Sequence, residues 1–488
     1  MSDSATLLAS VSETSTSGYQ WKGANLTSFF AILLGALCFW QLPAPTGLSE
    51  EAWHLFVIFI ATVASLIAKP LPMGALSIIV IVACTLTNTL TLQNSLVSFS
   101  SPIVWLVFVA FLIARGFIKT GLGARISYYF IMVLGKNTLG LSYGLIASEL
   151  LLAPFIPSNT ARGAGVIYPV IGALTKEYGS EPNNASRKKI GAYLTELCFQ
   201  ANVITSSMFI TAMAANPLIV SIAAGMGYEI SWGTWALAAI VPGLLCLALL
   251  PFLLYAIYPP DIKQTPEAPK LARQKLNEMG AIKVDEVFML GTFFVLLTLW
   301  VFGTGLGIEA TTTALLGLAI LLFSGVLSWD DIMAEKNAWN TFVWLAALLM
   351  LVKGLADLGV INWFSEHMQV AVAGMSWHFA LLLLVVVYYY AHYMFASMTA
   401  HVSSMFSAFA IVAIAAGAPP MVVVMLFAAI SSLSGGLTHY GTGTAPVYFA
   451  PGFVTLKEWW RIGAIMSVVY LLVWLSVGMW WWKIIGMW

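Results

Sequence analysis

A run of polar residues interrupts a long apolar stretch at Pro157-Ser158-Asn159-Thr160, and Arg162 follows within the next turn. Pro154 and Pro157 end the apolar helix before this run, and Ser158 is suited to cap the helix after it. Backbone N–H groups at a helix start favour an anion, and Arg162 adds positive potential. Ser158, Asn159 and Thr160 are therefore candidate ligand residues, although a cap that only stabilises the turn would use the same residue types.

A second polar turn lies at Met398-Thr399-Ala400-His401, inside another apolar stretch. A lone histidine at membrane depth is often a hydrogen-bonded core residue, but polar groups there are usually functional. When the two halves of the chain are aligned, Pro157-Ser158-Asn159-Thr160 matches Thr399-Ala400-His401-Val402, so His401 takes the position of Asn159. We therefore interpret Thr399, Ala400 and His401 as a second ligand-binding turn. His392 and the tyrosines at 388–390 precede this turn and are predicted to be packing residues with satisfied polar ends.

Two further apolar helices are interrupted by small and polar residues. One break runs from Thr205 to Pro217, and the other runs from Ser431 to Pro446. Such breaks free backbone carbonyls and hydroxyls, which lipid tolerates only where the chain faces protein or water. These groups can coordinate a cation or hold a carboxylate, whereas a pair of proline kinks would do neither. The candidate ligand residues in the two breaks are Thr211, Asn216, Thr438, Thr442 and Thr444.

Other chemistry has little support in the sequence. The segment 441–444, Gly-Thr-Gly-Thr, lacks the lysine of a nucleotide-binding loop, so ATP hydrolysis is not indicated. The four cysteines lie inside apolar runs without CxxC spacing, so neither a disulfide framework nor a metal cluster is predicted. No set of serine, histidine and carboxylate suggests an enzyme, and Glu149 and Glu196 are isolated. We therefore predict no catalytic activity, no cofactor and no metal.

The elements that must position the polar residues are membrane helices. Hydrophobic residues make up 60% of the 488 residues and charged residues 9%, against about 25% charged in soluble domains. Apolar runs of about 20 residues recur along the chain, as a ~30 Å hydrocarbon core requires. The polar turns lie in segments 138–177 and 378–417, which we predict to be re-entrant hairpins. We predict an all-α polytopic membrane protein with about eleven transmembrane helices, near 27–43, 53–68, 74–92, 103–120, 190–209 with 217–227, 231–258, 285–305, 308–327, 338–357, 421–436 with 445–455, and 462–485.

The distribution of the 21 Lys and Arg predicts the orientation. Most lie in segments that are cytoplasmic if the N-terminus is inside, in accordance with the positive-inside rule. We therefore expect a multi-pass protein of the cell inner membrane with a cytoplasmic N-terminus and a periplasmic C-terminus. Residues 1–26 are expected to form a disordered cytoplasmic tail, and residues 259–284 a partly helical cytoplasmic linker. The formal net charge of zero implies no nucleic-acid partner.

The two membrane halves, 27–258 and 285–488, resemble each other. Val104-Trp105-Leu106 and Val343-Trp344-Leu345 each open an apolar helix. In each half this helix is followed by a polar turn and then by a broken helix. The broken helices are 190–227 in the first half and 421–455 in the second. Because an odd number of crossings separates the two copies, the second is upside down. Inverted repeats place their substrate near the membrane midplane, where interrupted helices meet.

Several segments carry a family resemblance, namely LAPFIPSNTARGAG (152–165), SSMFITAMAANP (206–217), FASMTAH (395–401), LTHYGTGTAPVYFAPGFV (437–454) and WRIGAI (460–465). In these segments the chain resembles the divalent anion:sodium symporter family, in the branch of bacterial citrate:succinate and tartrate:succinate antiporters and plastid 2-oxoglutarate/malate translocators. The resemblance implies a scaffold domain, a transport domain that moves elevator-fashion, and a homodimer. It also implies that both polar turns bind the substrate carboxylates.

The second turn departs from the sodium-coupled members of that family, which carry Ser-Asn-Thr at both turns. This chain has Ala400-His401-Val402 there. An Asn side-chain carbonyl can ligate Na⁺, whereas a protonated histidine repels a cation. The resemblance therefore implies sodium-independent exchange of small di- or tricarboxylates such as succinate, malate, tartrate, citrate or 2-oxoglutarate. The alternatives are a Na⁺- or H⁺-coupled carboxylate or sulfate symporter and, from another class, a channel or a membrane-embedded enzyme.

Overall fold

The computed structural model of the chain describes residues 25–372 and 374–488. Of the predicted disordered tail, residues 1–26, the first 24 residues lie outside the described part of the chain. For its last two residues the prediction is wrong, because Asn25 caps helix α1 (Leu26–Trp40). The Asn25 side-chain oxygen accepts a hydrogen bond from the Ser28 N–H at 3.2 Å, and the Asn25 N–H donates to the Pro70 carbonyl at 2.7 Å.

The described part of the chain is built from helices, with an isolated bridge between Asn137 and Gln264 and no strand. Eight of the described helices are long and apolar enough to cross a membrane. After α1 the first half contains α2 (Glu50–Ala68), α3 (Met73–Leu86), α4 (Leu92–Leu96), α5 (Pro102–Thr120), α6 (Leu122–Leu134), α7 (Thr138–Leu152), α8 (Asn159–Arg162), α9 (Tyr168–Glu177), α10 (Gly191–Met208), α11 (Ala215–Gly225) and α12 (Trp232–Ile257). The linker helix α13 (Glu267–Met279) is followed by α14 (Val284–Phe302), α15 (Ala310–Phe323), α16 (Trp329–Ala334), α17 (Lys336–Asp357), α18 (Val360–Ala371), α19 (Trp377–Ala391), α20 (Met398–Ala415), α21 (Pro420–Leu433), α22 (Ala445–Phe449), α23 (Leu456–Val473) and α24 (Met479–Ile484).

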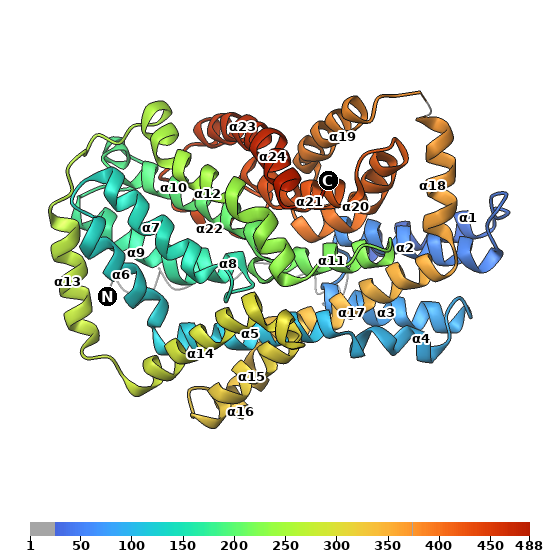
Figure 1. Cartoon of the computed structure of the whole chain (residues 1–488), viewed down its shortest axis with the longest axis horizontal. Helices are drawn as coiled ribbons and strands as arrows, with labels where there is room; N and C mark the ends of the chain where they lie inside the picture. The colour runs from blue at the N-terminus through green and yellow to red at the C-terminus, as the bar shows by residue number, and fades with distance from the viewer. Residues whose placement is uncertain (1–24, 373) are drawn as a thin grey trace, which may run out of the picture.

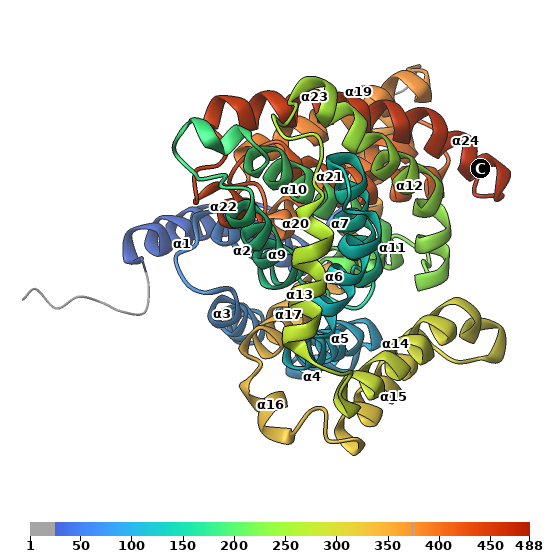
Figure 2. The same cartoon turned by 90° about the vertical axis from the view of Figure 1, so that its left-hand side faces the viewer.

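The helices form two layers, one above the other in Figures 1 and 2. The lower layer holds α3, α4, α5, α14, α15 and α17, and the upper layer holds α10, α12, α19, α21 and α23. In the lower layer α5 packs on α15 and α17, and in the upper layer α10 packs on α12 and α21. Helix α13 lies across one end of the molecule and α18 lies across the opposite end (Figure 1).

Each predicted hairpin consists of two helical arms joined by a turn. In the first hairpin the chain leaves α7, passes Pro154 and Pro157, and returns through α8, a π-helical turn and α9. Ser158 caps the returning arm as predicted, because its Oγ accepts from the Ala161 N–H at 3.1 Å. In the second hairpin Ser397 caps α20, and its Oγ accepts from the Ala400 N–H at 3.4 Å. Ser397 is not among the predicted site residues.

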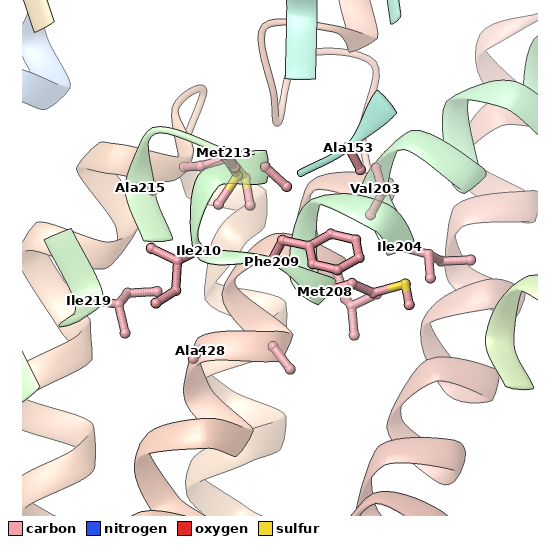
Figure 3. Close-up of a cluster of buried hydrophobic side chains, with 14 of the residues drawn as sticks. Ala153, Val203, Ile204, Met208, Phe209, Ile210, Met213, Ala215, Ile219 and Ala428 are labelled. Carbon is pink, nitrogen blue, oxygen red and sulfur yellow. The ribbon is translucent and has the colours of Figure 1, made fainter. Parts of the chain in front are cut away.

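Both predicted helix breaks are present. The first separates α10 from α11 by a short 3-10 turn, and the second separates α21 from α22 by residues 434–444. Around the first break, Met208, Phe209 and Ile210 belong to an apolar cluster to which Ala428 of α21 contributes (Figure 3). Apolar packing therefore holds the interrupted backbone of α10 against the second half of the chain.

The last long helix begins earlier than predicted. It starts at Leu456 and not at residue 462, because Thr455 and Glu458 form a capping box. The Thr455 Oγ accepts from the Glu458 N–H, and the Glu458 carboxylate accepts from the Thr455 N–H. Residues 450–455 form the turn that leads into this cap, so the second arm of the broken helix ends at Phe449 and does not reach residue 455.

Four helices, α4, α6, α16 and α18, are absent from the predicted spans. They have 5, 13, 6 and 12 residues, too few to cross a membrane, so hydropathy does not reveal them. Two of them, α6 and α18, are the longest. Helix α6 packs on α13, and the buried ion pair between Arg125 Nε and Glu286 Oε1 at 2.8 Å joins α6 to α14. Helix α18 packs on α17 and α20. Helices α6 and α18 each connect a long helix, α5 or α17, to the hairpin that follows it.

Candidate binding site between the hairpin turns

The two hairpin turns and the second helix break meet at one cavity of about 710 Å³. The first turn contributes Ser158 and Asn159, the second contributes Thr399 and Ala400, and the break after α21 contributes Thr442. These residues lie far apart in the sequence. The fold thus brings five of the predicted site residues to the wall of a single cavity.

Asn159 connects the first turn to the second helix break. Its Nδ2 donates to the Thr442 Oγ1 at 2.8 Å, and its Oδ1 accepts from the Thr160 N–H at 2.9 Å. Its backbone carbonyl accepts from the Asn202 Nδ2 at 3.1 Å. An amide nitrogen carries two hydrogens. One of those of Asn159 is bound to Thr442, no protein acceptor for the other is found among the described residues, and Asn159 lines the cavity.

Arg162 does not line the cavity. Its guanidinium is fully buried, and its Nε donates to the Glu149 Oε1 at 2.5 Å. Its Nη1 donates to the carbonyls of Ile156 and Ala212 at 2.8 and 2.9 Å. The prediction that Arg162 adds positive potential at the turn is wrong, because the Glu149 carboxylate neutralises its charge. The same ion pair shows that Glu149, which was predicted to be isolated, has a charged partner. The ion pair joins the two arms of the first hairpin, and the hydrogen bond of Arg162 to the Ala212 carbonyl fastens the turn to the break after α10.

His401 is buried on the side of the second turn that faces away from the cavity, and it does not line the cavity. Its ring is fully buried and stacks on Tyr388 with centroids 4.2 Å apart. Its Nδ1 lies 3.2 Å from the Nδ1 of His392. The prediction that His392 and the three tyrosines have satisfied polar ends is confirmed: His392 bonds to the Gly441 carbonyl, and Tyr388, Tyr389 and Tyr390 bond to Ser431, Leu433 and Ser467.

Thr211 and Asn216 hold the first helix break and do not line the cavity, although Met213, Ala214 and Ala215 between them do. The Thr211 Oγ1 donates to the Pro154 carbonyl at 2.5 Å, which ties the break to the first hairpin. The Asn216 Nδ2 donates to the carbonyls of Ser206 and Phe209 at 2.7 and 2.9 Å, which replaces helix hydrogen bonds lost at the break. Both side chains therefore stabilise the backbone that carries the first turn.

Three further predicted residues surround the second break. Thr160 lies so close to it that a Cβ at Gly443 would come 2.6 Å from the Thr160 Oγ1. A side chain at position 443 would therefore force the Thr160 hydroxyl to move. Thr438 and Thr444 are fully buried, and within the described part of the chain their hydroxyls have no hydrogen-bond partner.

The opposite wall of the cavity was not predicted. The turn between α2 and α3 supplies Lys69 and Pro70, and Ser65 and Asn25 lie beside it. Among the described residues that line the cavity, Lys69 alone is charged. Its sequence signal is the run Lys69-Pro70-Leu71-Pro72 between two apolar helices, a pattern that predicts a turn but not what the turn faces.

Comparisons with known proteins agree with this architecture. A family model described as "Sodium:sulfate symporter transmembrane region" matches residues 23–488. The chain is 53% identical to the putative malate transporter YflS of Bacillus subtilis, over 93% of this chain and 95% of that one. It is 46% identical to the chloroplastic dicarboxylate transporter 1 of Spinacia oleracea (96% and 83% covered) and 36% identical to the citrate/succinate antiporter of Escherichia coli (95% and 99% covered). The solved YdaH transporter of Alcanivorax borkumensis has a similar fold, with a TM-score of 0.55 at 13% identity over 94% of this chain and 98% of that one.

Proposed function

The chain belongs to the sodium:sulfate symporter family, and we propose that it is a secondary transporter that exchanges small di- and tricarboxylates without sodium. The observation that carries the proposal is the single cavity between the two hairpin turns and the second helix break. Its volume of about 710 Å³ is ample for a four- to six-carbon acid. Relatives named as malate, dicarboxylate and citrate/succinate transporters support the substrate class.

The cavity offers hydrogen-bond donors to a carboxylate. The free amide hydrogen of Asn159 and the hydroxyl of Thr399 line it, and α20 begins there with its backbone N–H groups. The start of a helix of 18 residues carries a partial positive charge. We infer that the substrate is contacted by the cavity-lining residues Ser158, Asn159, Thr399, Ala400 and Thr442. The other predicted residues do not line the cavity and stabilise the segments that carry the lining residues; they are Thr160, Thr211, Asn216, His401, Thr438 and Thr444.

The arrangement in the membrane follows from the same proposal. The chain crosses a bacterial inner membrane about eleven times, with its N-terminus inside and its C-terminus outside, and the two hairpins enter from opposite sides. The cavity borders the beginning of α1 and the turn between α2 and α3. With this orientation both lie on the cytoplasmic side, so the cavity faces inward. The layer with α5 and α17 is the scaffold, and the hairpins with the broken helices form the moving domain of each protomer in a homodimer.

Sodium-independent exchange is proposed because the second turn carries His401 where sodium-coupled relatives carry an asparagine, so the side-chain carbonyl that could ligate Na⁺ is missing. One observation favours the alternative, a cation-coupled symporter. The buried hydroxyls of Thr438 and Thr444 have no partner among the described residues, and hydroxyl and carbonyl oxygens are the ligands that Na⁺ prefers. The two functions differ in whether labelled substrate accumulates in a vesicle that contains no substrate. A symporter fills it, whereas an exchanger needs a counter-substrate inside.

The experiment is uptake of labelled succinate into proteoliposomes in which choline replaces Na⁺. One set is loaded with unlabelled succinate, malate, tartrate, citrate or 2-oxoglutarate, and the control set is empty. We expect uptake into loaded vesicles only, at a rate that does not change when Na⁺ is added. Uptake that requires Na⁺, or that proceeds equally into empty vesicles, would show that the protein is a symporter.

A further inference from the structure

Two buried histidines behind the second turn form a hydrogen-bonded pair. The Nδ1 atoms of His392 and His401 are 3.2 Å apart, and the Nε2 of His392 lies 2.8 Å from the Gly441 carbonyl oxygen. Both rings are fully buried. His401 directly follows the cavity residue Ala400 in the sequence, and Gly441 directly precedes the cavity residue Thr442. The pair therefore joins two parts of the cavity wall.

The partners of the rings determine where the protons are. A carbonyl oxygen can only accept, so the Nε2 of His392 carries a hydrogen. In the neutral pair the Nδ1 of His392 is then a bare acceptor, and the Nδ1 of His401 must donate to it. The Nε2 of His401 is left without a hydrogen, and it has no partner among the described residues. A neutral pair has no other arrangement that satisfies both hydrogen bonds.

A further proton can bind at one position only. The Nε2 of His392 and the space between the two Nδ1 atoms are already occupied by hydrogens, so the proton goes to the Nε2 of His401. The hydrogen between the Nδ1 atoms can lie on either ring, and the positive charge is therefore shared by both rings. The pair takes up one proton as a unit, and neither histidine has a titration of its own.

The pair lies in a part of the chain without fixed charge. Between Glu366 and Lys457 the sequence has no Asp, Glu, Lys or Arg. Tyr388 stacks on His401 and its hydroxyl is bonded to Ser431, while the Phe395 ring lies 5.0 Å from that of His401. Of the helices that pack on α20, α11 and α21 carry no titratable group. The charged and titratable groups on the others are Glu50, Glu51 and His54 near the start of α2, Glu366 and His367 on the exposed face of α18, and, on α19, His378 next to Trp377 and the tyrosines Tyr388, Tyr389 and Tyr390.

A buried charge without a counter-charge is strongly disfavoured. A proton on the pair would be such a charge while the cavity is empty, whereas a dicarboxylate in the cavity supplies two negative charges. We propose that His392 and His401 form one proton-binding unit that takes up a single proton when a dicarboxylate enters the cavity. In this unit His392 is a positioning residue that directs the proton to the Nε2 of His401. The inference rests on the proposed function, because it requires a carboxylate in this cavity.

The direct test measures protons. Purified protein in weakly buffered detergent solution at a pH above neutrality, where succinate is already a dianion, is mixed with saturating succinate in the presence of a pH dye. We expect an uptake of about one proton per chain. His401→Asn should bind succinate more weakly and take up none. Binding by the wild-type protein without proton uptake would overturn the inference and leave the proposed function intact, whereas no succinate binding would overturn the proposed function.

A pair of variants tests the role of His392. The oxygen of His392→Asn lies where the Nδ1 was and can still accept from His401, whereas the amide of His392→Gln reaches the Gly441 carbonyl and leaves His401 without an acceptor. For the wild-type protein and His392→Asn, we expect the KM for succinate exchange to rise up to about tenfold per pH unit above neutrality. For His392→Gln the KM should already be high at neutral pH and change little. Equal pH profiles for the two variants would show that His392 does not direct the proton.

Discussion

Asn159 is the residue at which a single substitution most sharply tests the candidate site. Its amide donates one hydrogen to the Thr442 Oγ1 at 2.8 Å and has one hydrogen free on the cavity side. Asn159→Ala removes both donors. Thr442→Val, which is nearly the same size as threonine, removes only the acceptor of the first bond and leaves the Asn159 amide in place. The two variants therefore separate contact with the substrate from support of the wall.

The expected losses differ in size. A hydrogen bond to a charged group contributes about 1.5–3 kcal/mol, which corresponds to about a 10- to 100-fold change. A bond between two neutral groups contributes about 0.5–1.5 kcal/mol, or roughly a 2- to 10-fold change. We therefore expect Asn159→Ala to lower kcat/KM for succinate by at least about 10- to 100-fold, close to loss of transport, and Thr442→Val to lower it by roughly 2- to 10-fold.

The assay is the initial rate of succinate exchange into proteoliposomes at several external concentrations, normalised to the amount of reconstituted protein. Size-exclusion profiles in detergent show whether each variant is folded. If well-folded Asn159→Ala and Thr442→Val lose activity to the same extent, Asn159 acts only by holding Thr442. If Asn159→Ala transports at the wild-type rate, the first turn does not bind the substrate.

Two further predictions concern charges. Arg162→Ala leaves the buried Glu149 carboxylate unpaired and should lower stability by about 3–5 kcal/mol, measured as thermal unfolding in detergent, whereas Lys119→Ala, which breaks a more exposed pair with Asp331, should cost less than about 1 kcal/mol. Similar losses for the two variants would show that the Arg162 pair is not a main support of the first turn. Lys69→Gln should raise the KM for succinate about two- to fivefold at low ionic strength, because Lys69 attracts the dianion to the cavity, and the difference should disappear at about 1 M salt. A rise in KM that does not depend on salt would indicate a direct contact.

Helix positions and turns were largely predictable from the sequence because they depend on local features. The length of each apolar run predicts where most long helices lie, although the capping box of Thr455 and Glu458 starts α23 earlier than its apolar run does, and Pro154, Pro157 and Ser158 determine the first turn within a few residues. The polar breaks after α10 and α21 were visible for the same reason. The short helices α4, α6, α16 and α18 were not, since a segment too short to span carries no hydropathy signal.

The direction of each polar side chain was decided by the tertiary structure. Thr211 and Asn216 were predicted to be ligand residues, but Thr211 bonds to the Pro154 carbonyl of the first hairpin, and Asn216 bonds to the Ser206 and Phe209 carbonyls at the break. Lys69 reached the cavity wall because the α2–α3 turn lies opposite the hairpins. The pairing of His392 with His401 needed the turn between α19 and α20 to bring two rings together. The sequence by itself therefore determined which polar groups lie at membrane depth, whereas long-range packing decided which of them face the cavity, because a buried polar group bonds to whichever partner the fold places nearest.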